Sequence, residues 1–582
     1  MIKKIFILIL SLLFVGILGF LCFKIAIKIH RHMNKPRLFD TSVLISKLND
    51  PTIQKGLRIF AASSLDRIFL DGRTLQKPSF SSSVSISSAR NGYESFQIVL
   101  VSPLKDRPGV FLQTSDFVNL KTGSRISGDN FTWAIVGYVQ TLLPYYPVKY
   151  VGLWPDPLIL ARSYDVKAST TQPFWLTVYI PDSTPAGDYS AHVSVKGLNF
   201  AVQSIPVHLH VYDFTLPKES HLKTAFDFYG QMTKIRYPQG AEESDAAWHA
   251  RLDDINDKFI IDMLKHRMNP ILNIDPSVPS ELSNIDRYRA LGLNNFAIGK
   301  HGGTFDNNWP KDVPSIEELR STYQTYGEDL KLNGLFDYTY IYTWDEGVIG
   351  NPLVPKIASM IHRAYPGLKN MVCYHGFWDP AQNPDWGRDI DIWTFQIDDF
   401  NERKMRQLQK MGMEMWMYIS GPSGTDSPNL AMDFDSIDYR IIPWICWKYD
   451  IRGFLYWCVN YWPTVDPFKN ARNTQWEQNG NGLLFYPGND GPWDSIRAEN
   501  FRDGMQDYEY IQILLNKLRI LHAKGLEQKY KGCFNQSVKL LTMDDSIVKS
   551  MGSFTRDGDY LKARRDAIAL QIEEINSLLN NP

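Results

Sequence analysis

The chain has 582 residues, which is enough for two or three domains that each bury a core. Its formal net charge of -1 gives no strong field for a charged polymer, so no nucleic-acid partner is expected. The five cysteines show no CxxC spacing, which argues against a disulfide framework and against a thiolate metal site. Aromatic residues make up 13%, a content that suits both sugar binding and a large core and therefore decides nothing alone.

The N-terminus carries an apolar run. Residues 5–23 follow two lysines and have about the length needed to cross a bilayer. A cleaved signal peptide has a shorter apolar core and a small-residue cleavage site, and no such site is evident here. The sequence therefore predicts an uncleaved membrane anchor, with a secreted protein as the alternative if the segment is removed.

Short alternating runs follow up to about residue 217. Stretches such as "YESFQIVLVS" and "FWLTVYIPDSTPAGDYSAHVSVKG" alternate apolar and polar residues and are broken by turn residues, including Pro185 and Gly187. This pattern is typical of an antiparallel β-sandwich. His208 and His210 share one face of a predicted strand, but no third ligand is near them, so no metal site is predicted.

From residue 222 the rhythm changes to strand, helix, strand, helix. Helical patterns include 246–266, a segment that starts at Ser315 with a capping box to Glu318, and a segment that starts near Ser495. Eight apolar runs lie between or beside these patterns: 222–228, 268–274, 295–299, 338–344, 370–376, 391–396, 414–421 and 453–462. The prediction is an α/β chain with a (β/α)8 TIM-type barrel preceded by the sandwich.

The predicted organisation has five segments. They are 1–35 (membrane anchor or signal), 36–54 (tether), 55–217 (β-sandwich), 218–524 (catalytic barrel) and 525–582 (C-terminal helical extension).

Two adjacent acids, Asp345 and Glu346, end the fourth predicted barrel strand, "YTYIYTW". The active site of such a barrel lies at the C-terminal ends of its strands, so this pair is the candidate catalytic pair. Other strand ends supply aromatic, amide and acidic side chains, as a glycosidase pocket requires. The simpler structural explanation of the acid pair is a strand end that meets water. The candidate substrate-binding residues are Asp227, His375, Trp393, Tyr418, Trp457, Asn460 and Trp462.

The adjacency of the two acids also bears on mechanism. Ordinary retaining glycosidases hold two carboxylates about 5 Å apart across the bond, whereas neighbouring strand residues point to opposite faces. At a strand tip both can still reach one sugar from the same side. This suits substrate assistance, in which the 2-acetamido oxygen attacks the anomeric carbon, Asp345 orients the amide and Glu346 serves as acid and base. Repulsion between the two carboxylates is expected to raise the pKa of Glu346.

Several stretches resemble glycoside hydrolase family 123 over about residues 60–520: "YESFQIVL", "WPDPL", "IYTWDEG", "DYRIIPWICWKYDIRGFLYWCVNYW" and "SIRAENFRDGMQDYEYIQIL". The resemblance implies a sandwich before a barrel and β-N-acetylgalactosaminidase chemistry, without a cofactor, through an Asp–Glu pair that falls on Asp345 and Glu346. The chain departs from the family pattern in Trp344 before the pair and Gly347 after it. The expected partner is a glycan or glycoconjugate. The enzyme is expected to be membrane-anchored, with its catalytic part outside the cytoplasm, although the basic residues after the apolar run favour the opposite orientation.

Two other functions stay open. One is a two-carboxylate glycosidase acting on another sugar, with Asp227 or Asp275 as the distant partner. The other is a non-catalytic, membrane-anchored carbohydrate-binding protein. The charged residues of "IRAENFRDGMQDYEY" are predicted to form salt bridges that fix their helix to the barrel rather than to take part in the site.

Overall fold

The computed structural model describes residues 38–40 and 57–580, apart from 103, 199, 300–314, 422–425, 463–465, 473 and 475. The predicted anchor, residues 5–23, lies outside the described residues. Within the described part of the chain, no helix has the length and apolar character to cross a bilayer.

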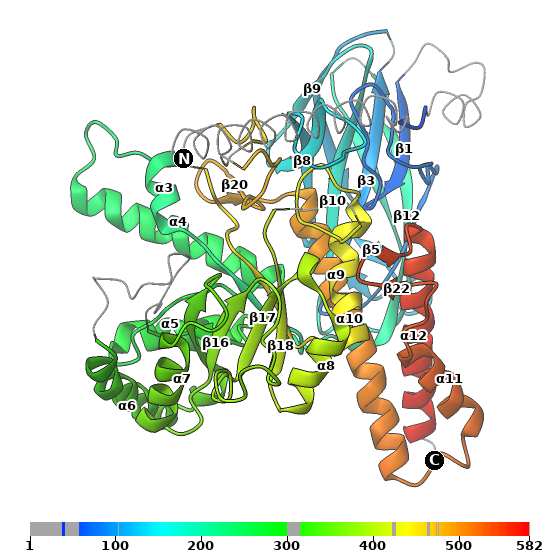
Figure 1. Ribbon diagram of the computed structural model, residues 1–582. Helices are drawn as coiled ribbons and strands as arrows, with labels where there is room; N and C mark the ends of the chain where they lie inside the picture. The colour runs from blue at the N-terminus through cyan, green and yellow to red at the C-terminus, as the bar shows by residue number, and fades with distance from the viewer. Residues whose placement is uncertain are drawn as a thin grey trace, which may run out of the picture.

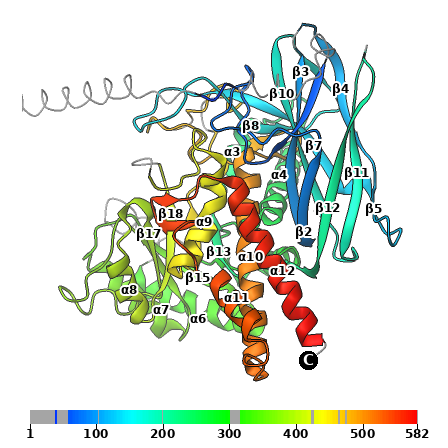
Figure 2. The same cartoon turned by 90° about the vertical axis from the view of Figure 1, so that its right-hand side faces the viewer.

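Two sheets packed face to face form the N-terminal part (Figures 1 and 2). The first, in spatial order, contains β1 (Arg58–Ser63), β3 (Gly92–Ser102), β10 (Thr170–Ile180), β7 (Phe131–Gln140) and β8 (Leu153–Ile159). The second contains β2 (Val84–Arg90), β12 (Gln203–Thr215), β11 (Gly187–Lys196), β4 (Arg107–Thr114) and β9 (Tyr164–Val166), with β5 (Phe117–Val118) and β6 (Arg125–Ile126) beside β11. The predicted sandwich is confirmed, except that β2 runs parallel to β12.

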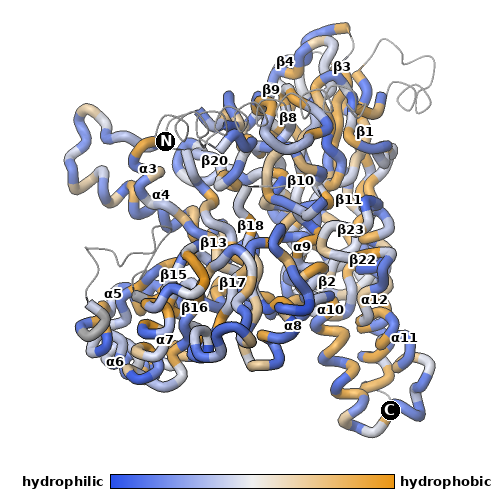
Figure 3. Tube along the Cα trace, viewed as in Figure 1, coloured by the Kyte–Doolittle hydropathy of each residue, from blue (hydrophilic) through white to orange (hydrophobic). Residues whose placement is uncertain are grey.

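Seven parallel strands form a nearly closed barrel. Their spatial order is β13 (Lys223–Phe226), β19 (Gly453–Tyr456), β18 (Glu414–Ile419), β17 (Ile392–Gln396), β16 (Asn370–Tyr374), β15 (Thr339–Asp345) and β14 (Phe296–Ala297). Figure 3 shows the hydrophobic character of β16, whose Met371, Val372 and Cys373 are all buried.

The eight-stranded prediction was wrong at its second strand, 268–274. This segment forms only single bridges, from Pro270 to Phe226 of β13 and from Ile274 to Ile298 beside β14. Pro270 has no N–H to donate, and Asn273 has a left-handed backbone with φ of 48°, so the segment cannot continue as a strand. It nevertheless fills the gap between β13 and β14.

Helices surround the barrel. They are α3 (Gly230–Arg236), α4 (Asp245–Lys265), α5 (Pro279–Ala290), α6 (Ile316–Leu332), α7 (Leu353–Ala364), α8 (Glu402–Lys410), α9 (Ser436–Tyr449) and α10 (Ile496–Ala523). The capping box of Ser315 and Glu318 is present, and Ser495 caps α10. The chain ends in α11 (Lys531–Leu541) and α12 (Gly558–Asn580), both of which pack against α10 (Figure 1). Short ladders pair β20 (Tyr486–Pro487) with β21 (Pro492–Trp493) and β22 (Val548–Ser550) with β23 (Ser553–Phe554).

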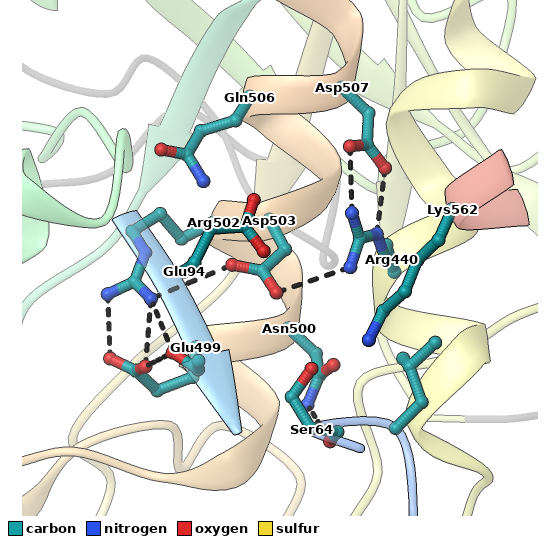
Figure 4. Close-up of polar contacts among 12 residues, drawn as sticks. Ser64, Glu94, Arg440, Glu499, Asn500, Arg502, Asp503, Gln506, Asp507 and Lys562 are labelled. Atoms are coloured by element: carbon teal, nitrogen blue, oxygen red, sulfur yellow. Dashed lines mark hydrogen bonds and ion pairs between the residues drawn. The ribbon is translucent and has the colours of Figure 1, made fainter. Parts of the chain in front are cut away.

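Buried charges hold α10 in place, as Figure 4 shows. Arg440 of α9 donates two hydrogen bonds to Asp507 of α10, at 2.8 and 2.9 Å. Glu499 of α10 accepts two bonds from Arg502, and it also accepts bonds from Ser95 and Trp175 of the sandwich at 2.7 and 3.0 Å. The predicted salt bridges therefore exist, and that of Arg440 ties α10 to a neighbouring barrel helix. Hydrogen bonds to Glu499 tie α10 to the sandwich as well.

Candidate active site

The carboxyl end of β15 departs twice from regular strand geometry. Tyr342 pairs with Met371 of β16, but Trp344 pairs with the very next residue, so Thr343 is an extra residue in the ladder. A bulge of this kind reverses which side of the sheet the following side chains face. Trp344 accordingly packs in the outer core, and Asp345 turns to the barrel mouth, where its Oδ1 accepts a hydrogen bond from the Tyr342 hydroxyl at 2.7 Å.

The second departure is at Glu346, which has φ of 48°, in the left-handed region. Its backbone N–H still donates to Cys373 O at 2.8 Å, but its side chain no longer alternates with that of Asp345. Glu346 Oε1 accepts a hydrogen bond of 2.6 Å from Tyr418 of β18. Tyr342 and Tyr418 belong to the same barrel-lining cluster, so both carboxylates are on the same side of the strand tip.

Burial raises the pKa of Asp345 to about 6. The hydrogen bond from Tyr342 opposes that rise, and the neighbouring charge of Glu346 adds to it. Asp345 is therefore ionised at neutral pH and becomes protonated as the pH falls through about 6.

Glu346 behaves differently from the prediction. Burial acts to raise its pKa, but hydrogen bonds from His375 and Tyr418 outweigh burial and lower it. The expectation of a raised pKa on Glu346 was therefore wrong. The charge of Glu346 instead raises the pKa of the neighbouring Asp345.

His375 follows β16 and lies between two carboxylates. Its Nε2 is 3.5 Å from Glu346 Oε1, and its Nδ1 is 2.9 Å from Asp399 Oδ2. The hydrogen bond with Glu346 raises the pKa of His375 to about 9 against the effect of burial, and Asp399 contributes in the same direction. The sequence analysis missed two residues of the site. Asp399 comes after β17, in a short 3-10 helix, Ile397–Asp399. Tyr342 could have been predicted to face the site from the alternation of side chains along β15.

Asp227 lies at the end of β13. Burial raises the pKa of Asp227 to about 7, the backbone N–H of Phe228 opposes this, and the charge of Asp345 adds to it. Asp227 therefore interacts electrostatically with Asp345, one of the two acids. Asp275 accepts hydrogen bonds from the backbone and side chain of Ser277 in its own turn, and these lower its pKa despite burial.

The loops after β19 form an aromatic cluster. Trp457 packs edge-on against Tyr461 and Trp476, with ring centroids 5.2 and 5.9 Å away, and its indole N–H donates to Asn481 at 2.8 Å. Trp476 is 51% exposed, so this cluster reaches the surface. The predicted site residue Asn460 is fully buried and supports the wall, because its side chain bonds the backbone N–H and C=O of Tyr229 at 2.9 and 3.0 Å.

Two predicted substrate-binding residues are core residues instead. Trp393 is fully buried and stacks on Tyr374 at 5.2 Å, on the side of β17 that faces the outer helices. Trp462 is also fully buried, packs against Phe259 and donates its indole N–H to Phe485 O at 3.1 Å. Neither ring can face a sugar.

Other polar groupings lie away from the acid pair. One group among the described residues could hold a metal ion: Asp262 and His266 from the end of α4 with Asp494. An open cavity of about 750 Å³ lies between the sandwich and the start of α12, with Asp66, Asp435 and Arg556 among its lining residues. Its lining does not include Asp345 or Glu346, so this cavity is not the candidate active site.

Comparisons with known proteins agree with this arrangement. The family model described as "Glycoside hydrolase 123, catalytic domain" matches residues 317–514, and that described as "Glycoside hydrolase 123 N-terminal domain" matches residues 77–197. A family 123 glycoside hydrolase from Clostridium perfringens, whose structure was reported for glycolipid glycan hydrolysis, is similar in fold. The TM-score is 0.62 at 14% identity, over 90% of this chain and 99% of that one.

More distant structures add little. A Bacteroides ovatus GH5 xyloglucanase covers 73% of this chain and 98% of its own at 10% identity, with a TM-score of 0.24. A putative glycoside hydrolase from Bacteroides vulgatus covers 74% and 78% at 10% identity, with a TM-score of 0.25. Neither score supports an argument, and no curated protein gives a significant match. The two family models together span more than half of the 582 residues, and the chain belongs to glycoside hydrolase family 123.

Proposed function

We propose that the protein hydrolyses a terminal β-linked N-acetylhexosamine, with N-acetylgalactosamine favoured, by a substrate-assisted retaining mechanism. The observation that carries this proposal is the position of Asp345 and Glu346 on the same side of one strand tip, produced by the bulge at Thr343 and the left-handed backbone of Glu346. Two carboxylates on one side cannot flank a glycosidic bond from opposite faces. They can act together on a sugar that supplies its own nucleophile.

In the first step the 2-acetamido oxygen forms a bond to the anomeric carbon as the glycosidic C–O bond breaks. Asp345 accepts the amide N–H and stabilises the positive charge that develops on the oxazolinium-like intermediate. Glu346 delivers a proton to the departing oxygen and, in the second step, takes a proton from the attacking water. The two inversions at the anomeric carbon give net retention.

Trp457 and Trp476 are the best candidates for a wall against which the sugar ring packs. Both rings belong to the loops after β19, and Trp457 is only partly buried. The Clostridium perfringens relative is associated with glycolipid glycans, and we therefore include glycoconjugates among the proposed substrates. A location outside the cytoplasm, with residues 5–23 as an anchor, completes the proposal.

Asp227 supports a second candidate function. Its carboxyl group is close enough to Asp345 for their charges to interact, so an Asp227–Glu346 pair could act as two catalytic carboxylates on a sugar without an acetamido group. Among the described residues, the partners that act on the carboxylate of Asp275 are Ser277 and Tyr326 and do not include either acid of the pair.

The thiazoline derived from N-acetylgalactosamine tests the main proposal, because it mimics the cyclic intermediate. We expect it to bind at least about a hundredfold more tightly than N-acetylgalactosamine itself, as intermediate mimics do. The preference should largely disappear in Asp345→Asn, which keeps the shape but removes the charge. Equal binding of the two compounds to the wild type would reject substrate assistance. Failure to turn over any aryl N-acetylhexosaminide would favour the non-catalytic function.

A further inference from the structure

We propose that Asp399, His375 and Glu346 form a proton relay in which His375 stores the proton that Glu346 delivers to the leaving oxygen. His375 was predicted from sequence as a substrate-binding residue, and this inference gives it a different role. It rests on the proposed function, because it assumes that Glu346 is the acid.

The geometry favours a doubly protonated ring. Both ring nitrogens of His375 face carboxylate oxygens, Nδ1 at 2.9 Å from Asp399 and Nε2 at 3.5 Å from Glu346. A carboxylate oxygen only accepts hydrogen bonds, so a favourable contact at each nitrogen needs an N–H on both. The ring is therefore an imidazolium between two anions, and its pKa is raised to about 9.

The same contacts leave Glu346 without a proton in the free enzyme. Its Oε1 accepts from the Tyr418 hydroxyl at 2.6 Å and faces the imidazolium, and both interactions favour the carboxylate. A general acid must nevertheless hold a proton when the glycosidic bond breaks. Nε2 of His375 lies 3.5 Å from Glu346 Oε1, so a proton on this nitrogen has a short path to that oxygen.

The relay moves one proton from His375 to the glycosidic oxygen and later returns one proton from water to His375. When the sugar is bound, the Nε2–H bond of His375 breaks and an O–H bond forms on Glu346, which leaves a neutral imidazole and a carboxylic acid. That proton passes to the glycosidic oxygen, which keeps the electron pair of the broken C–O bond while the acetamido oxygen bonds to the anomeric carbon. In the second step the water oxygen bonds to that carbon while the bond from the carbon to the acetamido oxygen breaks and restores the acetamido group. The proton lost by water goes to Glu346, and its transfer back to Nε2 restores the imidazolium.

Substrate binding supplies the reason for the first transfer. The side chain of His375 is 57% exposed and that of Glu346 is 18% exposed, so water reaches the pair in the free enzyme. A sugar that covers the mouth removes this water, and a drier site favours the neutral imidazole and carboxylic acid over the ion pair.

Four described groups act on the ring. Asp345 and Glu346 face it from the end of β15 and Asp399 from the turn after β17, while Tyr418 of β18 lies edge-on at 6.1 Å. The three carboxylates favour the charged ring, and Asp399 holds its Nδ1–H throughout the transfer. Asp399 is thus a positioning residue for the relay.

The test is the pH dependence of kcat/KM, which reports groups of the free enzyme, measured on the full chain with an N-acetyl-β-galactosaminide whose leaving group is poor and must be protonated. The wild type should lose activity on the basic side near pH 9, where His375 loses its stored proton. In His375→Gln, Glu346 must hold its own proton, so the basic limb should move to the acidic side of neutrality. Above the new limb activity should fall about tenfold for each pH unit. Asp399→Asn should shift the limb in the same direction, but less.

His362→Gln is the matched control. His362 of α7 forms a similar pair with Asp391, Nε2 to Oδ2 at 2.9 Å, away from the acid pair, and its loss should leave the pH profile unchanged. Equal losses in His375→Gln at every pH would mean that His375 only supports the structure, and they would overturn the relay.

Leaving groups separate the relay from the proposed function. Glu346→Gln and His375→Gln should both be impaired far more with a poor leaving group than with an activated aryl group, which needs little protonation. No leaving-group dependence in Glu346→Gln would reject Glu346 as the acid, and the proposed function with it. Dependence in Glu346→Gln, together with an unshifted basic limb in His375→Gln, would reject the relay alone.

Discussion

Arg497 connects the first turn of α10 with strand β8 of the sandwich. It is fully buried in the first turn of α10, and its Nε and Nη2 donate to Asp156 of β8 at 3.0 and 2.8 Å. Its Nη1 donates to the backbone oxygens of Leu430 and Gly480 at 2.8 and 2.7 Å. One guanidinium group therefore joins the sandwich to two loops of the barrel.

Arg497→Met keeps the length of the side chain and removes its charge and donors. Breaking a buried ion pair from one side costs roughly 3–5 kcal/mol, because the remaining charge is left in a medium that solvates it poorly. Asp156 retains the Tyr486 hydroxyl at 2.7 Å and faces Arg67 at 3.7 Å, which reduces this cost. The two carbonyls that lose their donor add roughly 1 kcal/mol each. The expected loss in the free energy of unfolding is therefore about 3–5 kcal/mol.

Urea unfolding followed by tryptophan fluorescence measures this loss as a lower midpoint at unchanged slope. Arg388→Met is the control, since the Arg388–Asp385 pair is 71% and 75% exposed and should contribute little. In the double variant Arg497→Met, Asp156→Asn, the loss should be smaller than the sum of the two single losses, because the unpaired charge is removed with its partner. An Arg497→Met midpoint as close to the wild type as that of Arg388→Met would show that α10 is not fixed by this contact.

Two further predictions concern the site. The acidic limb of kcat/KM should lie near pH 6, because Asp345 must be ionised to hold the amide. Tyr342→Phe should move this limb to higher pH, because it removes a hydrogen bond that lowers the pKa of Asp345. If the limb does not move in Tyr342→Phe, a group other than Asp345 produces it. Trp457→Ala should raise KM about tenfold with a smaller change in kcat, since the loss of one well-packed aromatic contact costs roughly 1–2 kcal/mol. Trp457→Phe should retain most of the affinity. An unchanged KM in Trp457→Ala would show that Trp457 is not part of the sugar wall.

The strand ends could be predicted because apolar runs and turn residues mark them locally. Asp227, Asp345, Glu346, His375 and Tyr418 all lie at such ends, and the barrel brings them to one mouth. The partners of these residues could not be predicted in the same way. That Asp399 meets His375 depends on the register between β16 and β17, which no local pattern encodes.

The side-chain directions were the weaker part of the prediction. Trp393 lies within β17, where successive side chains point alternately into the barrel and toward the helices. Its position in this alternation places its side chain on the helix side. Trp462 lies beyond the last residue of β19, where the strand pattern no longer applies. Aromatic residues at strand ends suit a pocket and a core equally, so composition alone could not separate the two.

The adjacency of Asp345 and Glu346 carries a structural requirement that follows from strand geometry alone. In a regular strand that places Tyr342 inward, Asp345 would face outward, and the acid pair would be split between the two sides. The extra residue Thr343 reverses this parity, and the left-handed backbone of Glu346 breaks it again one step later. A left-handed non-glycine residue costs on the order of 1 kcal/mol or more, a strain that persists where the surroundings enforce it. Here the hydrogen bonds of Glu346 to Cys373 and Tyr418 do so, and the irregular backbone is what converts two neighbouring acids into one site.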